Sequence, residues 1–220
     1  MYFPGGGSRR WQLPYRGSIR RNYIEGTGAE LWIPLYPLLP DYDLMDETEF
    51  TIRLHEKMLK RFPAENIVWL GISGGADVLM QAGRHMVKKY PELPMPGLML
   101  PVSVSGLLMS EDAKTRMRGI DSRDPILHWD MFETMVKYYN PNGDLPQYIL
   151  GKADEDDYTG FPKIIMYFGG DEVFAGIAPD YEIKIKEGMP HAYPMFTFLK
   201  EGREGEREII ADINRYFESC

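Results

Sequence analysis

The sequence predicts an α/β fold, namely a three-layer, doubly wound, mostly parallel sheet with helices on both faces. Short apolar runs that suit buried strands alternate along the chain with segments whose apolar residues recur at helical spacing. Between Val68 and Met80 the chain passes from such a run through a glycine-rich turn into a helical pattern. The 220 residues suffice for one domain with a substantial core.

The order of the expected elements follows from the apolar patterns and from the Pro and Gly residues that interrupt them. Strands are expected at residues 31–36, 67–70, 98–104, 163–168 and 181–186. Helices are expected at residues 15–23, 46–62, 78–90, 128–139 and 205–218, the second with acidic side chains in its first turn. Residues 1–220 should form a single domain, in which residues 105–160 could supply a small lid.

Composition and charge exclude several classes of protein. The formal charge is −8, from 25 basic and 33 acidic residues, and the only basic clusters are Arg9-Arg10 and Arg20-Arg21, so nucleic acid is not an expected partner. No apolar run has the length of a membrane span, and the start of the chain does not resemble a signal peptide. The single cysteine, Cys220, allows no intrachain disulfide and indicates no metal site. We therefore expect a cytoplasmic protein that uses no metal and no other cofactor.

The turn Gly71-Ile72-Ser73-Gly74-Gly75 has the G-x-S-x-G spacing that places a serine at a sharp strand-to-helix turn. A side chain two residues to either side of the serine would clash with the neighbouring strand or helix, which explains the glycines. The hydroxyl of Ser73 would then stand above the sheet, and the N–H of Gly74 would begin a helix whose positive end faces a developing oxyanion. The alternative is a glycine-rich turn that contains a serine by chance.

Two further polar groups follow expected strands. Asp171 comes after the strand at 163–168 and His191 after the strand at 181–186, so both should lie at the carboxyl edge of the sheet, where open α/β sheets bind ligands. The chain order Ser73, Asp171, His191 is that of a Ser-Asp-His triad on this type of sheet. Read alone, a Gly-Gly-Asp segment can be only a turn, and a single histidine is often structural.

Taken together, these segments resemble the α/β-hydrolase fold and, within it, the hormone-sensitive-lipase-like esterases. The matching segments are Tyr2–Gly7 for the family's HGGG loop, Pro34–Pro40 for its YRLAPE segment, Gly71–Gly75 for its GDSAGG elbow, and Gly170-Asp171 and Gly188–His191 for its acid and histidine loops. The resemblance covers most of the chain.

The resemblance implies a role for each of these residues. Ser73 would be the nucleophile, His191 the general base, and Asp171 the carboxylate that orients the imidazole. The N–H groups of Gly5, Gly6 and Gly74 would form the oxyanion hole.

The sequence also departs from the family pattern. Pro4 stands where the family has the histidine of its glycine loop, and Ile72 stands where it has the aspartate of its elbow. By this resemblance we expect the fold to lack the family's first strands and its N-terminal cap. The acyl pocket should therefore be more open, and a second copy of the chain could cover the exposed sheet edge in a homodimer.

The leading hypothesis is a serine carboxylesterase that cleaves small, neutral, short-acyl esters through an acyl-enzyme. A peptidase or amidase could use the same triad, because the fold does not fix the function. A third hypothesis is an impaired hydrolase that serves as a binding or scaffold protein, which the short start and Pro4 favour.

The connection between Asp171 and His191 is short for a parallel crossover. Residues 170–180 include Gly176 and Pro179, which suit a helix interior poorly. We expect a non-helical crossover that still returns the chain to the sheet at 182–186 and brings His191 close to Asp171.

Overall fold

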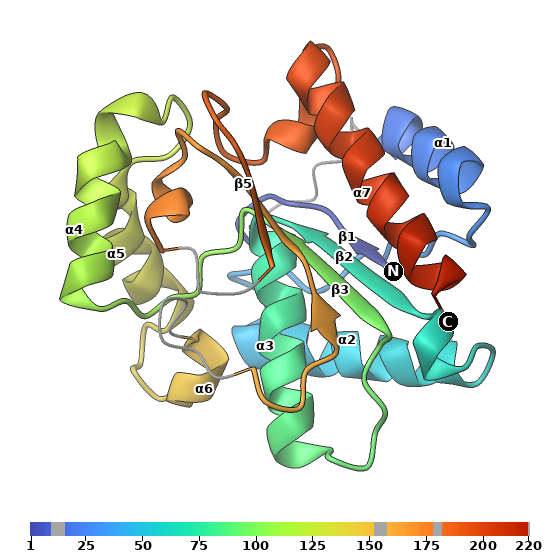
Figure 1. Cartoon of the computed structure of the whole chain (residues 1–220). Coiled ribbons are helices and arrows are strands. Elements are labelled where there is room, and N and C mark those ends of the chain that lie inside the picture. Colours follow the sequence, from blue (N-terminus) through green and yellow to red (C-terminus); the bar gives the residue numbers. More distant parts are fainter. Residues whose placement is uncertain (10–15, 152–157, 178–181, 220) are drawn as a thin grey trace.

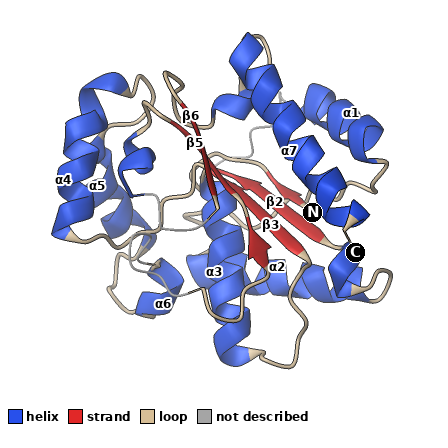
Figure 2. Ribbon diagram, viewed as in Figure 1, coloured by secondary structure: helices blue, strands red, loops and turns tan. Residues whose placement is uncertain are grey.

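A computed structural model describes residues 1–9, 16–151, 158–177 and 182–219 of the chain. Within these residues six strands form one sheet in the order β1-β2-β3-β5-β6, with β4 also paired to β3 (Figure 2). Every pairing is parallel. The strands are β1 (Tyr2–Phe3), β2 (Val68–Ile72), β3 (Leu98–Val102), β4 (Lys163–Ile164), β5 (Met166–Gly169) and β6 (Ile183–Lys186).

Helices cover both faces of this sheet (Figure 1). Helices α2 and α3 pack on one face, and α1 and α7 pack on the opposite face. Helices α4 and α5 lie beyond the ends of the central strands, and α6 packs against α3. The α-helices are α1 (Arg16–Thr27), α2 (Leu44–Leu59), α3 (Gly74–Lys89), α4 (Glu111–Ile120), α5 (Trp129–Tyr139), α6 (Gln147–Leu150) and α7 (Lys200–Glu218). The 3-10 helices are η2 (Ala64–Asn66), η3 (Asp121–Arg123), η4 (Val173–Ile177) and η5 (Tyr193–Met195). None of the described helices is long and apolar enough to cross a bilayer.

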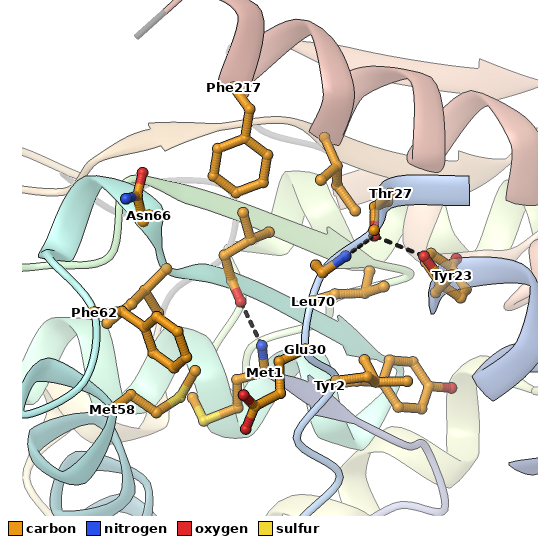
Figure 3. A pocket seen from close by; sticks show the side chains of 16 residues that line it. Met1, Tyr2, Tyr23, Thr27, Glu30, Met58, Phe62, Asn66, Leu70 and Phe217 are labelled. Atoms are coloured by element: carbon orange, nitrogen blue, oxygen red, sulfur yellow. Dashed lines mark hydrogen bonds between the residues drawn. The ribbon is translucent and has the colours of Figure 1, made fainter. Parts of the chain in front are cut away.

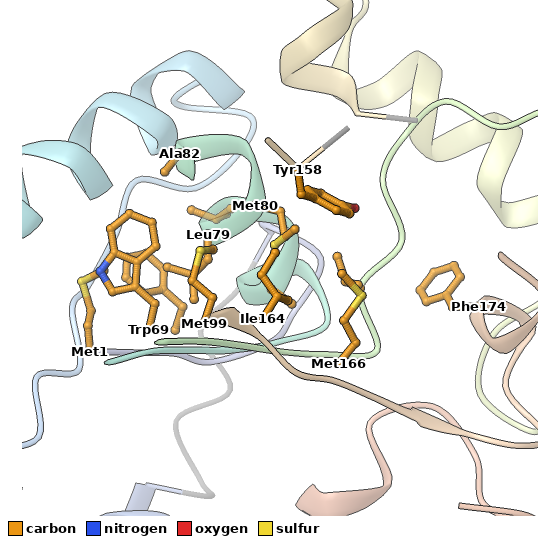
Figure 4. Close-up of a cluster of buried hydrophobic side chains, with 14 of the residues drawn as sticks. Met1, Trp69, Leu79, Met80, Ala82, Met99, Tyr158, Ile164, Met166 and Phe174 are labelled. Carbon is orange, nitrogen blue, oxygen red and sulfur yellow. The ribbon is translucent and has the colours of Figure 1, made fainter. Parts of the chain in front are cut away.

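Alternate residues of the central strands supply the two main cores. Trp69 of β2 and Met99 of β3 pack with α2 and α3, while Leu70 and Leu100 pack with α1 and α7. This period of two is what a sheet with helices on both faces requires. Figure 4 shows the first core, which the side chains of α3 and of the strands fill from opposite sides.

The structure confirms most of the expected elements and corrects one strand. Residues 31–36 do not form a strand. The chain runs beside β1 there, and the Tyr2 N–H donates to the Trp32 carbonyl at 2.9 Å. Helix α4 was not expected, because its sequence is mostly polar and it buries only Ala113 and Met117. The helices expected at 15–23 and 128–139 correspond to α1 and α5, although residue 15 lies outside the described residues.

The expected strand at 163–168 is divided into β4 and β5, and Pro101 of β3 gives the reason. Ile165 N–H donates to the Met99 carbonyl at 3.0 Å, and Ser103 N–H donates to the Tyr167 carbonyl at 2.7 Å. In this register the N–H of residue 101 would donate to the carbonyl of Ile165, but proline has no N–H. One rung of the ladder is therefore missing between β3 and its neighbour.

The crossover after β5 is only partly as expected. Its first described residues contain the short 3-10 helix η4, so the expectation of no helix is wrong there, while residues 178–181 lie outside the described residues. Strand β6 does return to the sheet and pairs with β5 from Met166↔Ile183 to Gly169↔Lys186. The short connection therefore still places the loop after β6 at the carboxyl edge.

Close backbone contact explains the glycine at position 75. A Cβ atom there would lie 2.3 Å from the Phe3 carbonyl oxygen and 2.7 Å from that of Pro4. Neither atom belongs to a flexible side chain, so the backbone itself would have to shift.

We expect Gly75→Ala to lower the free energy of unfolding by about 3 kcal/mol or more, the upper range for added groups in a filled interior. Gly119→Ala is the matched control, because a Cβ at this position of α4 meets nothing within 4 Å. The control should be neutral or stabilising by up to about 1 kcal/mol, as alanine is the better helix former. Urea unfolding of both variants measures the difference, and equal stability of the two would contradict the steric argument.

Candidate active site

Ser73 occupies a strained turn at the carboxyl end of β2. Its backbone has φ 53° and ψ −129°, an unusual conformation for a residue with a side chain. The N–H of Ser73 donates to the Val102 carbonyl at 2.8 Å, which ties the turn to the end of β3. A Cβ on Gly71 would lie 2.5 Å from the Gly75 carbonyl oxygen, so the strand and helix can meet this closely only with glycine present.

His191 lies against the Ser73 hydroxyl, as the sequence predicted. The distance from His191 Nε2 to Ser73 Oγ is 2.8 Å, which is hydrogen-bond length. The histidine sits on the loop after β6, where Gly188 has φ 72° and Ala192 has φ 56°. Its ring is 5 % exposed and meets the edge of the Phe174 ring, with centroids 5.2 Å apart.

The carboxylate beside the other ring nitrogen belongs to Glu172 and not to Asp171. Glu172 Oε2 lies 3.9 Å from His191 Nδ1, and Glu172 is completely buried. Asp171 Oδ1 instead lies 3.1 Å from a guanidinium nitrogen of Arg123, in a partly exposed ion pair. The expected approach of Asp171 to His191 is therefore replaced by that of its neighbour.

The hydrogen bonds of the turn after β5 account for this shift by one residue. Asp171 N–H donates to the Met189 carbonyl at 3.0 Å, and Gly169 N–H donates to Glu172 Oε2 at 3.1 Å. The first bond places Asp171 at the outer side of the turn, and the second holds the side chain of Glu172 beneath it. No sequence signal separates two adjacent carboxyl residues at such a turn, so the choice depends on these bonds.

The glycine loop lies directly over the serine turn. A Cβ on Gly5 would be 3.2 Å from Ser73 Cβ, and a Cβ on Gly74 would be 2.9 Å from the backbone nitrogen of Gly7. Among the described residues, none accepts a hydrogen bond from the N–H of Gly5 or Gly6. The structure thus brings the expected donors and the serine together and leaves these two N–H groups available.

Side chains that the sequence did not indicate hold this loop in place. The Tyr36 hydroxyl donates to the Pro4 carbonyl at 2.8 Å, and the Tyr139 hydroxyl donates to the Gly7 carbonyl at 2.6 Å. The Ser8 hydroxyl donates to Glu47 Oε2 at 2.9 Å. These three bonds anchor a loop in which Pro4 takes the place of the family's histidine.

Burial sets the protonation of the two titratable groups beside Ser73. It lowers the pKa of His191 to about 3, so the imidazole is neutral at neutral pH and can accept a proton. Burial raises the pKa of the Glu172 carboxyl to about 8, against the opposing effect of its bonds from Ser103 and Gly169. A rise in pH through that range therefore gives Glu172 its negative charge.

An apolar cavity of about 510 Å³ lies between α4, α5 and the segment after β3. The Phe132 ring forms part of its wall and packs edge-on against Phe174, at 5.7 Å between centroids, while Phe174 packs in turn against His191. Figure 3 shows a second cavity, of about 370 Å³. Val68, at the start of β2, is among its lining residues, so this cavity lies at the opposite end of the strand from Ser73. The described residues contain no cluster of three His, Cys, Asp or Glu side chains that could hold a metal ion.

Buried carboxyl groups beneath the glycine loop should make stability depend on pH. Glu47 is completely buried, and burial raises the pKa of its carboxyl well above the usual value. A carboxyl with a raised pKa in the folded protein stabilises the fold while it is protonated, and this contribution is lost as the pH rises from its unfolded toward its folded pKa.

We expect Glu47→Gln to raise the Tm relative to the wild type by an amount that grows between pH 5 and pH 8, because the amide never ionises. Glutamine keeps an acceptor for the Ser8 hydroxyl. Glu56→Gln on the same helix is the control, since Glu56 is exposed, and its Tm difference should not grow over this pH range. A Tm difference for Glu47→Gln that is constant across this pH range would contradict the argument.

Comparison with known proteins places this architecture among characterised folds. No protein-family model and no curated protein matches the sequence. Among solved structures, an esterase from the bacterial hormone-sensitive lipase family matches with a TM-score of 0.81 and 19% identity, over 98% of this chain and 75% of that chain. EstE7, a homologue of hormone-sensitive lipase from a metagenome library, matches with a TM-score of 0.80 and 21% identity, over 98% of this chain and 77% of that chain. An esterase/lipase from an uncultured bacterium gives a TM-score of 0.77 and 18% identity, over 99% and 76%. The chain thus has the α/β-hydrolase fold seen in these hormone-sensitive-lipase-like proteins.

Proposed function

We propose that this protein is a serine hydrolase that cleaves small-molecule carboxylic esters through an acyl-enzyme on Ser73. The observation that carries the proposal is the 2.8 Å contact between His191 Nε2 and Ser73 Oγ, at a strained turn beneath the glycine loop. The esterases named among the similar structures support the same chemistry.

In the proposed reaction the Ser73 oxygen attacks the ester carbonyl carbon, and its proton passes to His191 Nε2. The N–H groups of Gly5, Gly6 and Gly74 stabilise the negative oxygen of the tetrahedral intermediate. Collapse of the intermediate breaks the bond to the alcohol, which leaves with the proton from His191. Water then repeats the sequence, with His191 as base, and releases the acid and the free serine.

In this proposal Glu172, rather than Asp171, orients the imidazole. His191 Nδ1 has no other partner among the described residues, and Glu172 Oε2 is the carboxylate oxygen beside it. Their separation of 3.9 Å is too long for a hydrogen bond, and such catalytic bonds often shorten only when substrate binds. A charged Glu172 would also stabilise the imidazolium that forms during the reaction.

The cavity beside Phe132 supports an apolar group in the substrate. Only the Phe132 and Phe174 rings are packed in series between this cavity and the histidine, and its buried lining includes Leu107 and Met117. We therefore propose a neutral ester whose acyl or alcohol part is short enough for about 510 Å³. In this proposal residues 105–160, which include α4, α5 and α6, act as the lid over that group.

Ser73→Ala should abolish hydrolysis of p-nitrophenyl acetate while the protein stays folded. Loss of a triad serine lowers kcat by about 10⁶-fold in subtilisin, which sets the scale. A fluorophosphonate should label the wild type once, on Ser73, and should not label the variant. Ser219→Ala, an exposed serine after α7, is the control that keeps full activity.

Unchanged turnover in Ser73→Ala would exclude the mechanism. An unlabelled, inactive wild type would favour a non-catalytic binding protein. Hydrolysis of an anilide faster than of the matched ester would point to an amidase instead.

Glu172→Gln should lower kcat by up to about 10⁴-fold, the scale of the corresponding change in a serine protease. Asp171→Asn is its matched neighbour and removes only a partly exposed ion pair with Arg123, so its kcat should change by a few-fold at most. A large loss in Asp171→Asn together with a small one in Glu172→Gln would return the role to Asp171.

The pH profile of the wild type should carry the same signature. Because burial raises the pKa of Glu172 to about 8, kcat should still be rising between pH 7 and pH 8. This rise should be missing in Glu172→Gln, which has no charge to gain. A wild-type profile that is flat above pH 6 would show that ionisation of Glu172 does not limit the rate.

A further inference from the structure

We propose that Ser103 is a positioning residue that holds Glu172 and the His191 loop against each other through one buried hydroxyl. The inference rests on the proposed function, because it concerns the same serine–histidine site. Ser103 follows β3 directly and is completely buried, and nothing in its sequence context, Pro-Val-Ser-Val, marks it as functional.

The backbone at Ser103 is strained in the same way as at Ser73. Its φ is 53°, a region that favours glycine, yet a serine occupies it. The described non-glycine residues with positive φ are Ser8, Ser73, Ser103 and Ala192. All four lie around the candidate site, where such strain is often maintained because the conformation places a functional group. At Ser103 the group that the strained backbone positions is the side-chain hydroxyl, which a glycine would lack.

The hydroxyl of Ser103 makes two bonds that connect separate elements. It donates to Glu172 Oε2 at 2.7 Å and accepts the Ala192 N–H at 2.9 Å. An N–H can only donate, so the single hydroxyl hydrogen remains for the carboxylate. Ala192 is the residue after His191, so one oxygen atom fixes the acid relative to the backbone that carries the base.

This arrangement affects the charge of Glu172 as well as its position. Its Oε2 receives bonds from the Ser103 hydroxyl and the Gly169 N–H, while its Oε1 has no partner among the described residues. A hydrogen bond to a carboxylate favours the charged form. Removal of the hydroxyl should therefore make Glu172 harder to ionise.

Among the described residues, no other titratable group around Glu172 donates a hydrogen bond to it in this structure. His191 faces it across 3.9 Å from the loop after β6. The Asp124 carboxylate, in the segment after η3, raises the pKa of Glu172, and Tyr193 of η5 interacts with it electrostatically. Asp171 and Arg123 pair with each other at the outer side of the turn. Ser103 is thus the only side-chain hydroxyl among the described residues that donates to this carboxylate.

The test compares Ser103→Ala and Ser103→Gly with Ser105→Ala. Ser105 lies two residues further along and is also fully buried, and its hydroxyl donates to Asp77 Oδ2 at 2.9 Å. The control therefore loses the same kind of bond away from Glu172. Glycine relieves the positive φ at position 103, so it keeps the test valid if the alanine variant folds poorly.

We expect both Ser103 variants to lower kcat for p-nitrophenyl acetate by about 10- to 100-fold, with KM changed by a few-fold at most. The rising limb in the pH profile of kcat should move to higher pH by about one unit, because that is the scale of the pKa change when a charged group loses one hydrogen bond. Ser105→Ala should change the Tm and leave the position of the limb unchanged.

The position of the rising limb in the pH profile of kcat distinguishes this role from a merely structural one. An active wild type together with a Ser103→Gly variant whose limb is unshifted and whose kcat is within twofold would overturn the inference alone. A shift of equal size in Ser105→Ala would overturn it as well. A wild type that neither hydrolyses the ester nor reacts with a fluorophosphonate would overturn the proposed function first, and this inference with it.

Discussion

The close contact between the glycine loop and the serine turn is the constraint on which the rest of the candidate site depends. Gly75 touches the carbonyls of Phe3 and Pro4, so β1, β2 and α3 can meet only if no side chain intervenes there. At this meeting point Ser73 has a positive φ, and Gly5 of the loop lies against its side chain. Three side-chain hydrogen bonds hold the loop in this position. Tyr36 and Tyr139 donate to the carbonyls of the loop, and Ser8, at its end, donates to Glu47.

Much of this could be predicted from the sequence, because apolar period and glycine spacing are local signals. The strand that leads to Ser73, the helix that follows it, and the return of the chain before His191 are of this kind. The choice between Asp171 and Glu172 is not, since it depends on which backbone groups close the turn after β5. The missing strand at 31–36 has a similar cause: an apolar run predicts burial, but a strand also needs a bonded neighbour along its length.

The electrostatics of the site come from removing water and not from opposite charges. His191 and Glu172 are both enclosed, and burial shifts the pKa of each toward its neutral form. Glu47 and Asp77 lie nearby with raised pKa values for the same reason. In a cluster of this kind, raised carboxyl pKa values reduce the negative charge near the glycine loop, where a negative oxygen would have to be stabilised. Such a cluster also makes the fold sensitive to alkali, because each ionisation would place a charge in a medium of low polarity.

The hydrogen bond that Pro101 cannot donate affects how the two halves of the sheet are joined. Strands β1, β2 and β3 carry the glycine loop and Ser73, whereas β5 and β6 carry Glu172 and His191. The boundary between these halves has one hydrogen bond fewer than a full ladder, and beyond Pro101 it is closed by the bond from the Ser103 N–H to the Tyr167 carbonyl, at 2.7 Å. The nucleophile and its base therefore sit on opposite sides of a seam. Their alignment therefore depends on the hydrogen bonds at the carboxyl end of this boundary, such as the one from the Ser103 N–H to the Tyr167 carbonyl.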